Sequence, residues 1–310
     1  MRRLTAAHLD EVGRLSDART FFWLDLEDPS PPQLERLGNA LGLHPLAIED
    51  TREWGQRPKL DTYEDHGFLV FYTARMEVGQ PRAAEVHLFI SGGWVVTFHR
   101  GPCPPLDAVA ASEPDARSEA EAVYRILDAL TDGYEPIIGE IEDRVDALES
   151  EVFERARPSQ LERIYRLKQD VGGLARRVTV QHDTFPSTSA AVTALPGLEH
   201  SGEAYLRDVG DHLALAAGEF HRQVADLQAL TDTYYNASTN RLNTLATRLS
   251  VAATFFLVWT LVTGFFGQNF GWLVDSTGSL RDFLILGLGG LLVPTVALVV
   301  YFWRRRGDWS

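Results

Sequence analysis

Two long uncharged runs close to the C-terminus constrain this 310-residue chain more than any other feature. Neither Ser250–Val274 nor Phe283–Trp303 contains a charged residue. A helix needs roughly 20 apolar residues to cross the hydrocarbon core of a bilayer, and both runs reach that length. We therefore predict a membrane hairpin, in preference to two buried helices of a soluble protein. Its parts are a first transmembrane helix over 250–269, an external loop over 270–282, a second transmembrane helix over 283–303 and a basic tail over 304–310.

Basic residues around the hairpin predict its orientation. Arg304–Arg306 follow the second run, and Arg241 and Arg248 precede the first, whereas the connecting loop offers only Arg281. Because positive charge is retained on the cytoplasmic side, both termini should be cytoplasmic in a multi-pass protein of the cell (inner or plasma) membrane. Two helices alone enclose no pore, so transport through this hairpin would require several copies of the chain.

The charge balance limits the choice of partners. The chain has 43 acidic and 29 basic residues, a formal net charge of -14, which argues against a nucleic-acid partner. Cys103 is the only cysteine, so an intrachain disulfide framework is excluded. Twelve of the acids lie in 119–154 beside only two bases. That stretch is either a solvated helix face or a surface that raises the local concentration of cations.

The middle of the chain, 116–249, has the pattern of a helical stalk. Acidic helices are expected over 119–154, and a further helix over 159–184. Apolar residues then recur at the helical spacing of three and four from Leu206 to Tyr234. No proline interrupts the chain between Pro196 and Pro294. We therefore predict one continuous helix from about Glu203 to about Phe266, roughly 95 Å long at 1.5 Å per residue.

The first part of the chain, 1–115, has a different pattern. Strand-like runs begin at Phe21, Phe68, Val86 and Trp94 and alternate with helix signals, such as the Ser30-Pro31-Pro32-Gln33 helix start. These runs predict a small α/β domain, which makes the whole chain an α+β membrane protein. No nucleotide-binding loop or nucleophile motif is present, so no enzyme and no organic cofactor are expected. The scattered His200, His212 and His221 are expected to face solvent.

One face of the first membrane helix is small or polar along its length. Leu249 and Leu257 are its bulky exceptions, and Phe255, Phe256, Trp259 and Phe266 lie on the opposite side. This face could be a small-residue surface for helix packing, or the lining of a pore in which the two leucines form hydrophobic constrictions. The members of the face, at spacings of three or four after a first step of eleven, are Asp232, Asn243, Ala246, Ser250, Ala253, Leu257, Thr260, Gly264 and Gly267.

The neutral oxygens on this face suit one ion in particular. Mg²⁺ gives up its water reluctantly and usually keeps several waters when bound. Amide and hydroxyl oxygens can hold such an ion through its waters, weakly enough to release it. The helix also ends near Gly267, where the carbonyl ends of several copies would concentrate cations.

These segments resemble the CorA-type divalent-cation transporters over nearly the whole chain. The resemblance is carried by Leu41–Tyr72, by the stalk segments IEDRVDALESEVFE, LERIYRLKQDV and YLRDVGDHL, and by YYNASTNRLNTLATRLSVAATFFLVWTLVTGFFGQNF. It implies a homopentamer in membrane lipid, with a cytoplasmic funnel of long helices, an outer α/β domain and ion movement along the fivefold axis. The implied function is influx of divalent cations, most of all Mg²⁺, with Co²⁺ or Ni²⁺ as further candidates.

The resemblance also implies roles for single residues. Gly267, Gln268 and Asn269 stand at the Gly-Met-Asn signature of the family, where Asn269 would first meet the hydrated ion. Asp208 would hold a regulatory Mg²⁺ between subunits, with Glu77 as its partner acid, and metal there would keep the funnel closed. The remaining matches are the pore residues Asn243, Thr260 and Gly264 and the inner acidic ring at Asp232.

Departures from the family pattern leave the ion open. Gln268 replaces the signature methionine, Asp275 is the only acid of the segment FGWLVDSTGSL that follows the signature, and Ala246 stands where the family usually has a bulky gate residue. Zinc transporters of the ZntB branch also vary the signature residue, so Zn²⁺ transport is an alternative. A membrane scaffold that kept the fold without conduction is a second alternative.

Overall fold

The computed structural model describes residues 2–112, 116, 118–195, 198, 203–268, 270–276 and 278–304. Within them the chain divides into two compact units, Met1–Tyr234 and Tyr235–Ser310. The helix α8 (Glu203–Phe266) begins in the first unit and ends in the second. Its bounds confirm the continuous helix that the sequence predicts.

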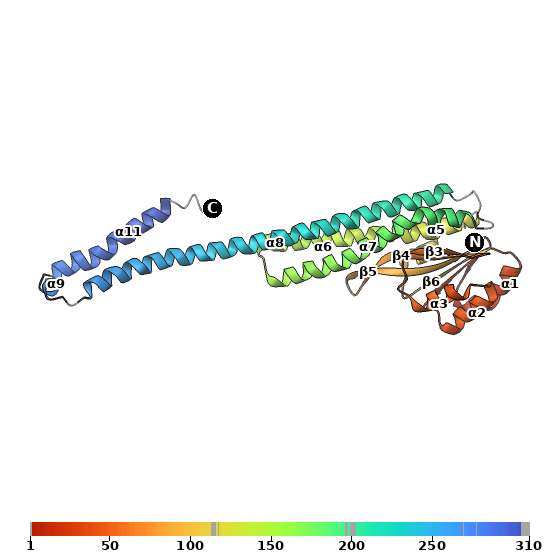
Figure 1. The fold of residues 1–310 in the computed structure, drawn as a ribbon, viewed down its shortest axis with the longest axis horizontal. Coiled ribbons are helices and arrows are strands. Elements are labelled where there is room, and N and C mark those ends of the chain that lie inside the picture. The colour runs from red at the N-terminus through yellow and green to blue at the C-terminus, as the bar shows by residue number, and fades with distance from the viewer. Residues whose placement is uncertain are drawn as a thin grey trace. The chain divides into compact units, whose positions relative to one another are not determined.

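A six-stranded sheet organises the first unit (Figure 1). Its first three strands in spatial order run parallel, and the other three pair antiparallel. The spatial order is β1 (Arg2–Leu4), β2 (Phe22–Glu27), β6 (Trp94–His99), β5 (Gln80–Ile90), β4 (Gly67–Glu77) and β3 (Lys59–Thr62).

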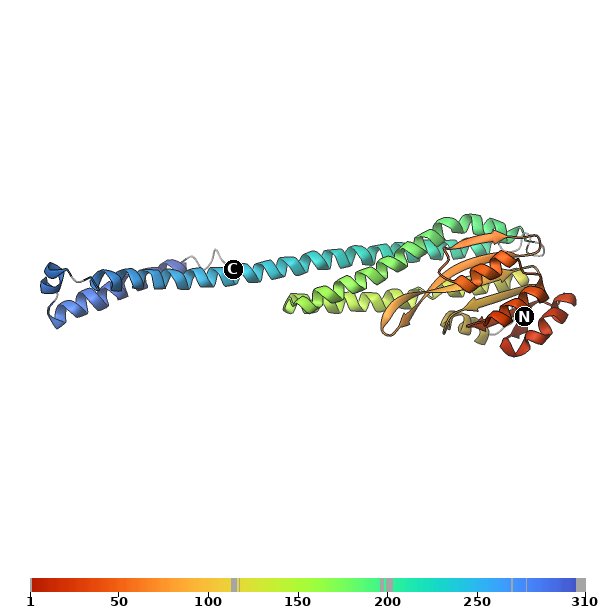
Figure 2. The same cartoon turned by 60° about the horizontal axis from the view of Figure 1, so that its bottom comes forward.

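The sheet is buried on both faces because apolar residues occupy both sides of its central strands. Phe68 and Val70 of β4 belong to one core, which is covered by the short helices α1 (Val12–Asp17), α2 (Pro31–Leu41) and α3 (Pro45–Glu53). The short helices lie together on one side of the sheet in both views (Figures 1 and 2). The 3₁₀ turn η1 (Ala6–Glu11) precedes them.

The other face of the sheet packs against long helices. Leu69 and Phe71 of β4, which alternate with Phe68 and Val70, join one continuous core with these helices. The sheet and the helical stalk therefore fold around shared apolar side chains. The helices are α4 (Pro104–Ala111), α5 (Glu119–Asp132), α6 (Glu135–Glu154), α7 (Pro158–Thr193) and the first part of α8.

The first unit departs from the sequence-based expectation in two places. The sheet has two further strands, β1 and β3, which are short, partly exposed and polar, so they lack an alternating apolar pattern. The helix expected to end at 184 continues through Pro186 to Thr193. Phe185 and Val192 are buried on its packed face, and their burial favours continuation of the helix past the proline.

The second unit contains the two apolar helices. The C-terminal part of α8 is followed by α9 (Gly271–Ser276), α10 (Leu280–Asp282), a π-helical turn η2 (Phe283–Leu288) and α11 (Gly289–Arg304). Two helical segments, Glu203–Phe266 and Leu280–Arg304, are long and apolar enough to cross a membrane, with peak mean hydropathies of 1.9 and 2.5. Neither apolar window is buried within the described chain.

Candidate cation pathway and metal site

The second apolar helix packs against one side of α8. Trp259 Nε1 donates a hydrogen bond of 2.9 Å to Thr295 Oγ1 of α11. The rings of Phe255 and Phe302 lie with their centroids 6.3 Å apart. A Cβ atom added at Gly290 would lie 3.4 Å from a Val262 methyl carbon, so the backbone of α11 comes close to α8 there. These contacts define which side of α8 its own chain covers.

The side predicted to line a pore is a different one. Leu257 is two residues from both Phe255 and Trp259, which corresponds to about 200° around the helix. Leu249 and Leu257 are each 71% exposed in the described chain. Asn243, Thr260 and Gly264 are exposed as well. Among the described residues, α11 therefore leaves the polar face of α8 uncovered.

The polar groups on this face offer oxygen atoms. Thr260 Oγ1 donates its hydrogen to Phe256 O at 2.7 Å, so its lone pairs remain to accept from the waters of an ion. Asp232, further towards the N-terminus of α8, is exposed and accepts a hydrogen bond of 3.3 Å from Gln228 Nε2.

The helix ends at the signature that the sequence singles out. Gly267 N donates to Thr263 O at 2.9 Å, and Gln268 N donates to Phe265 O at 3.3 Å. Gln268 is exposed immediately after the helix. Asn269, predicted to be the first ion contact, lies outside the described residues.

A separate cluster of metal-ligand residues joins α5 to α8 in the first unit. Asp128 of α5 and Asp208 and His212 of α8 offer ligand atoms that all lie within 4.8 Å of one another. Asp208 and His212 are four residues apart and therefore share one face of α8. The cluster offers two carboxylates and one imidazole, a donor set that accepts Mn²⁺, Co²⁺ or Zn²⁺ as well as Mg²⁺.

Two facing atoms make this cluster a candidate metal site. Asp128 Oδ1 lies 3.6 Å from His212 Nδ1, and both atoms are buried without a hydrogen-bond partner among the described residues. Asp132 Oδ1 also lies 3.4 Å from His212 Nδ1. Buried polar atoms normally find partners, and an ion between these atoms would supply one.

The surroundings of the cluster raise the pKa of Asp128 and of the neighbouring Tyr124. Burial and the nearby charge of Asp132 raise the pKa of Asp128. Burial and the charge of Asp128 also raise the pKa of Tyr124, so the phenol stays protonated. It donates a hydrogen bond of 3.1 Å to Asp208 Oδ2, which helps to orient that carboxylate.

The sequence-based expectation of solvent-facing histidines is met only in part by His212. Its side chain is 40% exposed and lies among Asp128, Asp132 and Asp208. The Asp208-x-x-x-His212 spacing was a signal for this cluster, because residues four apart are neighbours on a helix. Asp128 carries no such signal, since its proximity to α8 arises only in the tertiary structure. His221 is exposed, and His200 lies outside the described residues.

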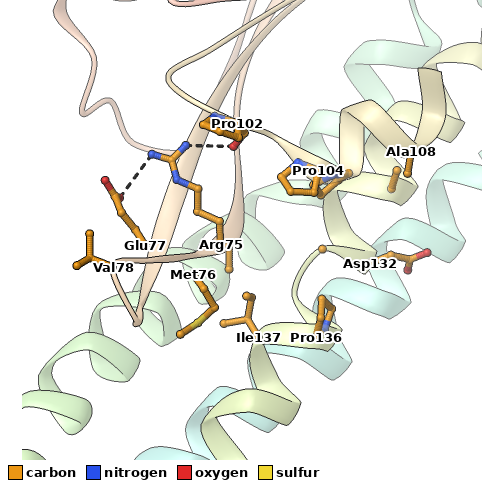
Figure 3. Close-up of a pocket in the computed structure, with 14 residues that line it drawn as sticks. Arg75, Met76, Glu77, Val78, Pro102, Pro104, Ala108, Asp132, Pro136 and Ile137 are labelled. Atoms are coloured by element: carbon orange, nitrogen blue, oxygen red, sulfur yellow. Dashed lines mark hydrogen bonds and ion pairs between the residues drawn. The ribbon is translucent and has the colours of Figure 1, made fainter. Parts of the chain in front are cut away.

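Glu77, predicted to be the partner acid of Asp208, is not a member of this cluster. Its carboxylate lies 3.5 Å from Arg75 and is 54% exposed. Glu77 and Asp132 both line a cavity of about 760 Å³ formed by the end of β4, the 102–108 segment and the helix ends near Gly133 (Figure 3). Asp132 therefore lines this cavity and also lies next to His212.

Comparisons with known proteins identify the family. A family model described as "CorA-like Mg2+ transporter protein" matches residues 18–306. This chain belongs to that family of transporters, is a membrane protein with two transmembrane helices and carries divalent metal ions.

Relatives in the family differ in the ion that their names give. The putative metal ion transporter YfjQ of Bacillus subtilis is 28% identical, covering 91% of this chain and 88% of the relative. The cobalt/magnesium transport protein CorA of Thermotoga maritima is 25% identical over 98% of this chain and 88% of its own. The zinc transport protein ZntB of Pectobacterium atrosepticum is 24% identical over 93% of this chain and 87% of its own.

A solved structure shows the same fold. The complete CorA magnesium transporter of Methanocaldococcus jannaschii superposes with a TM-score of 0.79 and 17% sequence identity, covering 91% of this chain and 90% of the other. The N-terminal α/β domain, the long stalk helix and the two transmembrane-length helices are thus the CorA fold.

Proposed function

We propose that this chain assembles into a homopentamer that conducts Mg²⁺ into the cytoplasm along the polar face of α8. The observation that carries the proposal is the exposed face formed by Asn243, Leu257 and Thr260, which α11 leaves uncovered. Several copies arranged with this face inward would bury Leu249 and Leu257 against one another. The two leucines would then form constrictions that gate the pore by excluding water.

Mg²⁺ is the ion that this face suits best. Its polar groups are amide and hydroxyl oxygens, and the sequence has no histidine or cysteine after His221. Such oxygens hold Mg²⁺ through its retained waters, whereas Zn²⁺ prefers nitrogen and sulfur ligands. Gly267, Gln268 and Asn269 would form the outer entrance, and Asp232 an inner ring of acids. Both termini would face the cytoplasm.

The cluster of Asp128, Asp208 and His212 would provide feedback. Cytoplasmic Mg²⁺ bound there would stabilise the closed assembly. When cytoplasmic Mg²⁺ becomes scarce, the ion would dissociate and the assembly would open. Asp208 would face the neighbouring subunit, where Glu77 would complete the site. The regulatory ion would thus be the transported ion.

Zinc transport is the second candidate, and two observations favour it. His212 supplies a nitrogen ligand beside two carboxylates, a combination that Zn²⁺ accepts. Gln268 replaces the methionine of the signature at the helix end. Neither feature places a nitrogen or sulfur ligand on the polar face of α8, so Mg²⁺ remains the preferred cargo.

Ion flux into liposomes that contain the purified full-length protein tests this function. Mg²⁺ and Zn²⁺ would be compared, each with and without a pH gradient. We expect Mg²⁺ entry that is indifferent to the gradient and is lost in Asn269→Ala with the oligomer intact. Gradient-dependent Zn²⁺ entry would favour the zinc alternative. Absence of flux for both ions from an intact oligomer would overturn transport and favour a scaffold.

A further inference from the structure

An acidic cavity lies between α6 and α8, apart from the two sites described above. It is a cavity of about 170 Å³ within the first unit, and it shares no lining residue with the Asp128–Asp208–His212 cluster or with the polar face of α8. Its lining comes from one face of each helix. The residues are Glu142, Val145, Asp146, Glu149, Arg222, Gln223, Asp226, Ala229, Leu230 and Thr233.

Carboxylate residues of both helices line this cavity. Glu142, Asp146 and Glu149 are spaced by four and three residues, so they line one face of α6. Asp226 faces them from α8, and Arg222 is the only basic residue of the lining. The four carboxylates outnumber the one guanidinium, so the cavity is negatively charged.

Arg222 occupies only one end of the cavity. Its guanidinium lies 3.4 Å from Glu142 and 3.1 Å from Asp226. Asp146 and Glu149 have no ion pair or hydrogen bond in the described ranges. Both are exposed to solvent, as are Glu142 and Arg222.

A buried amide points to a ligand at the same place. Gln223 is only 1% exposed, and its Nε2 atom donates a hydrogen bond of 2.7 Å to Ile138 O of α6. This bond fixes which end of the amide is the nitrogen. The other end, Gln223 Oε1, is buried and has no hydrogen-bond partner among the residues that the structure describes. A buried carbonyl oxygen without a partner, in a cavity lined by carboxylates, is an acceptor suited to a cation or to the water that a cation carries.

We propose that this cavity binds a hydrated divalent cation of the Mg²⁺ class. Asp146 and Glu149 would hold the ion, and Gln223 Oε1 would accept from one of its waters. Every donor available is an oxygen, which favours hard cations over Zn²⁺. Space for several waters fits an ion that keeps part of its hydration shell. Bound there, the ion would link α6 to α8, and it would do so whether or not the chain transports Mg²⁺.

Binding of Mn²⁺ to the full-length protein in detergent tests the site, with the free ion counted by electron paramagnetic resonance. All proteins would carry Asp208→Asn and His212→Ala, which disable the other cluster. We expect the added pair Asp146→Asn and Glu149→Gln to weaken Mn²⁺ binding at this site by about tenfold or more. The matched control is Asp143→Asn with Glu154→Gln, which removes the same charge from exposed positions of α6 outside the cavity and should leave the binding unchanged.

Two further measurements identify the ligand atoms and the ion. Gln223→Met keeps a similar volume and removes the oxygen, so it should also weaken Mn²⁺ binding, provided that the protein keeps its unfolding temperature. Added Mg²⁺ should displace the bound Mn²⁺ at concentrations where Na⁺ does not. Equal Mn²⁺ binding by the cavity variant and its matched control would overturn the site. Failure of Mg²⁺ to displace Mn²⁺ would overturn the assignment to the Mg²⁺ class.

Discussion

Trp259 of α8 and Thr295 of α11 are joined by a hydrogen bond of 2.9 Å between the indole nitrogen and the threonine hydroxyl. This bond fixes the rotation of the two apolar helices relative to each other, because it sets which side of α8 meets α11. Leu257 and Thr260 then point to another side and remain exposed. The partition of α8 into a covered face and a free polar face is the structural basis of the proposed cation pathway.

Asp128→Asn should change stability in opposite directions with and without metal. Burial and the charge of Asp132 raise the pKa of Asp128 in the folded protein. The protonated carboxyl of Asp128 therefore stabilises the fold at low pH, and this stabilisation is lost as the pH rises through the folded pKa. At neutral pH the metal-free carboxylate therefore destabilises the fold. We expect Asp128→Asn to raise the unfolding temperature of the metal-free protein by on the order of 2 °C. The same substitution should remove most of the increase in unfolding temperature that Co²⁺ causes, which we call the Co²⁺ gain.

Thermal unfolding at pH 7 with EDTA or with Co²⁺ measures both effects. Asp211→Asn, at an exposed position of α8 outside the cluster, is the control and should keep the Co²⁺ gain. A Co²⁺ gain retained in Asp128→Asn would contradict the metal site.

Asp25 and His99 should give the first unit its greatest stability in mildly acidic solution. His99 Nε2 lies 3.4 Å from Asp25 Oδ1, and His99 Nδ1 lies 2.7 Å from Gly101 O, so both ring nitrogens face acceptors. Burial opposes the charge of His99, but the hydrogen bond and the attraction of Asp25 outweigh burial and raise the pKa of His99. Burial likewise opposes ionisation of Asp25, but hydrogen bonds from His99 and Thr97 prevail and lower the pKa of Asp25.

The signs of these two pKa shifts define a pH window. The raised pKa of His99 gives stability that is complete below about pH 6.5 and is lost as the pH rises through the folded pKa. The lowered pKa of Asp25 gives stability that is complete above about pH 4 and is lost as the pH falls through its folded value. His99→Gln should therefore lower the unfolding temperature at both pH values. The decrease at pH 5.5 should exceed the decrease at pH 8 by on the order of 3 °C. An equal loss at both pH values, or the same pH profile in the exposed control His221→Gln, would contradict the ion pair.

Gly133 and Gly139 should respond in opposite ways to alanine. A Cβ atom at Gly133 would overlap Thr73 Oγ1 and lie 2.7 Å from the Pro105 ring, whereas a Cβ at Gly139 meets nothing within 4 Å. We expect Gly133→Ala to lower the free energy of unfolding by about 1–3 kcal/mol. Gly139→Ala, on the exposed side of α6, should raise it by about 0.5–1 kcal/mol. Denaturant unfolding measures both, and a tolerated alanine at Gly133 would show that the packing of β4 against α5 is looser than described.

Local sequence patterns predict most of the fold. A strand or helix that buries one apolar face has apolar residues that recur in the sequence at the spacing of that strand or helix. The runs at Phe68, Val86 and Trp94 become central strands, and the spacing from Leu206 onward becomes α8. The edge strands β1 and β3 were missed because their backbone pairing, rather than an apolar pattern, holds them in the sheet. Membership of the CorA-like family was predicted from the signature segment and is confirmed.

The candidate metal cluster contains one residue that the sequence analysis singled out, Asp208, whose metal role stays a prediction. His212 could have been added, since both lie on one face of a predicted helix. Asp128 lies on another helix far away in the sequence, and only the packing of α5 against α8 brings it within reach. The same reason explains why the acids of α6 gave no indication of Gln223 on α8.

Cationic thiol labelling of α8 during flux tests the proposed pathway most directly. The native Cys103 is buried, and burial raises the pKa of its thiol to about 12, so it should stay unreactive in the control. A positively charged methanethiosulfonate reagent should block Mg²⁺ entry into liposomes through Thr260→Cys and should have no effect on Phe255→Cys, which faces α11. Block at Phe255→Cys, or normal flux through a fully labelled Thr260→Cys, would contradict a pathway along the polar face of α8.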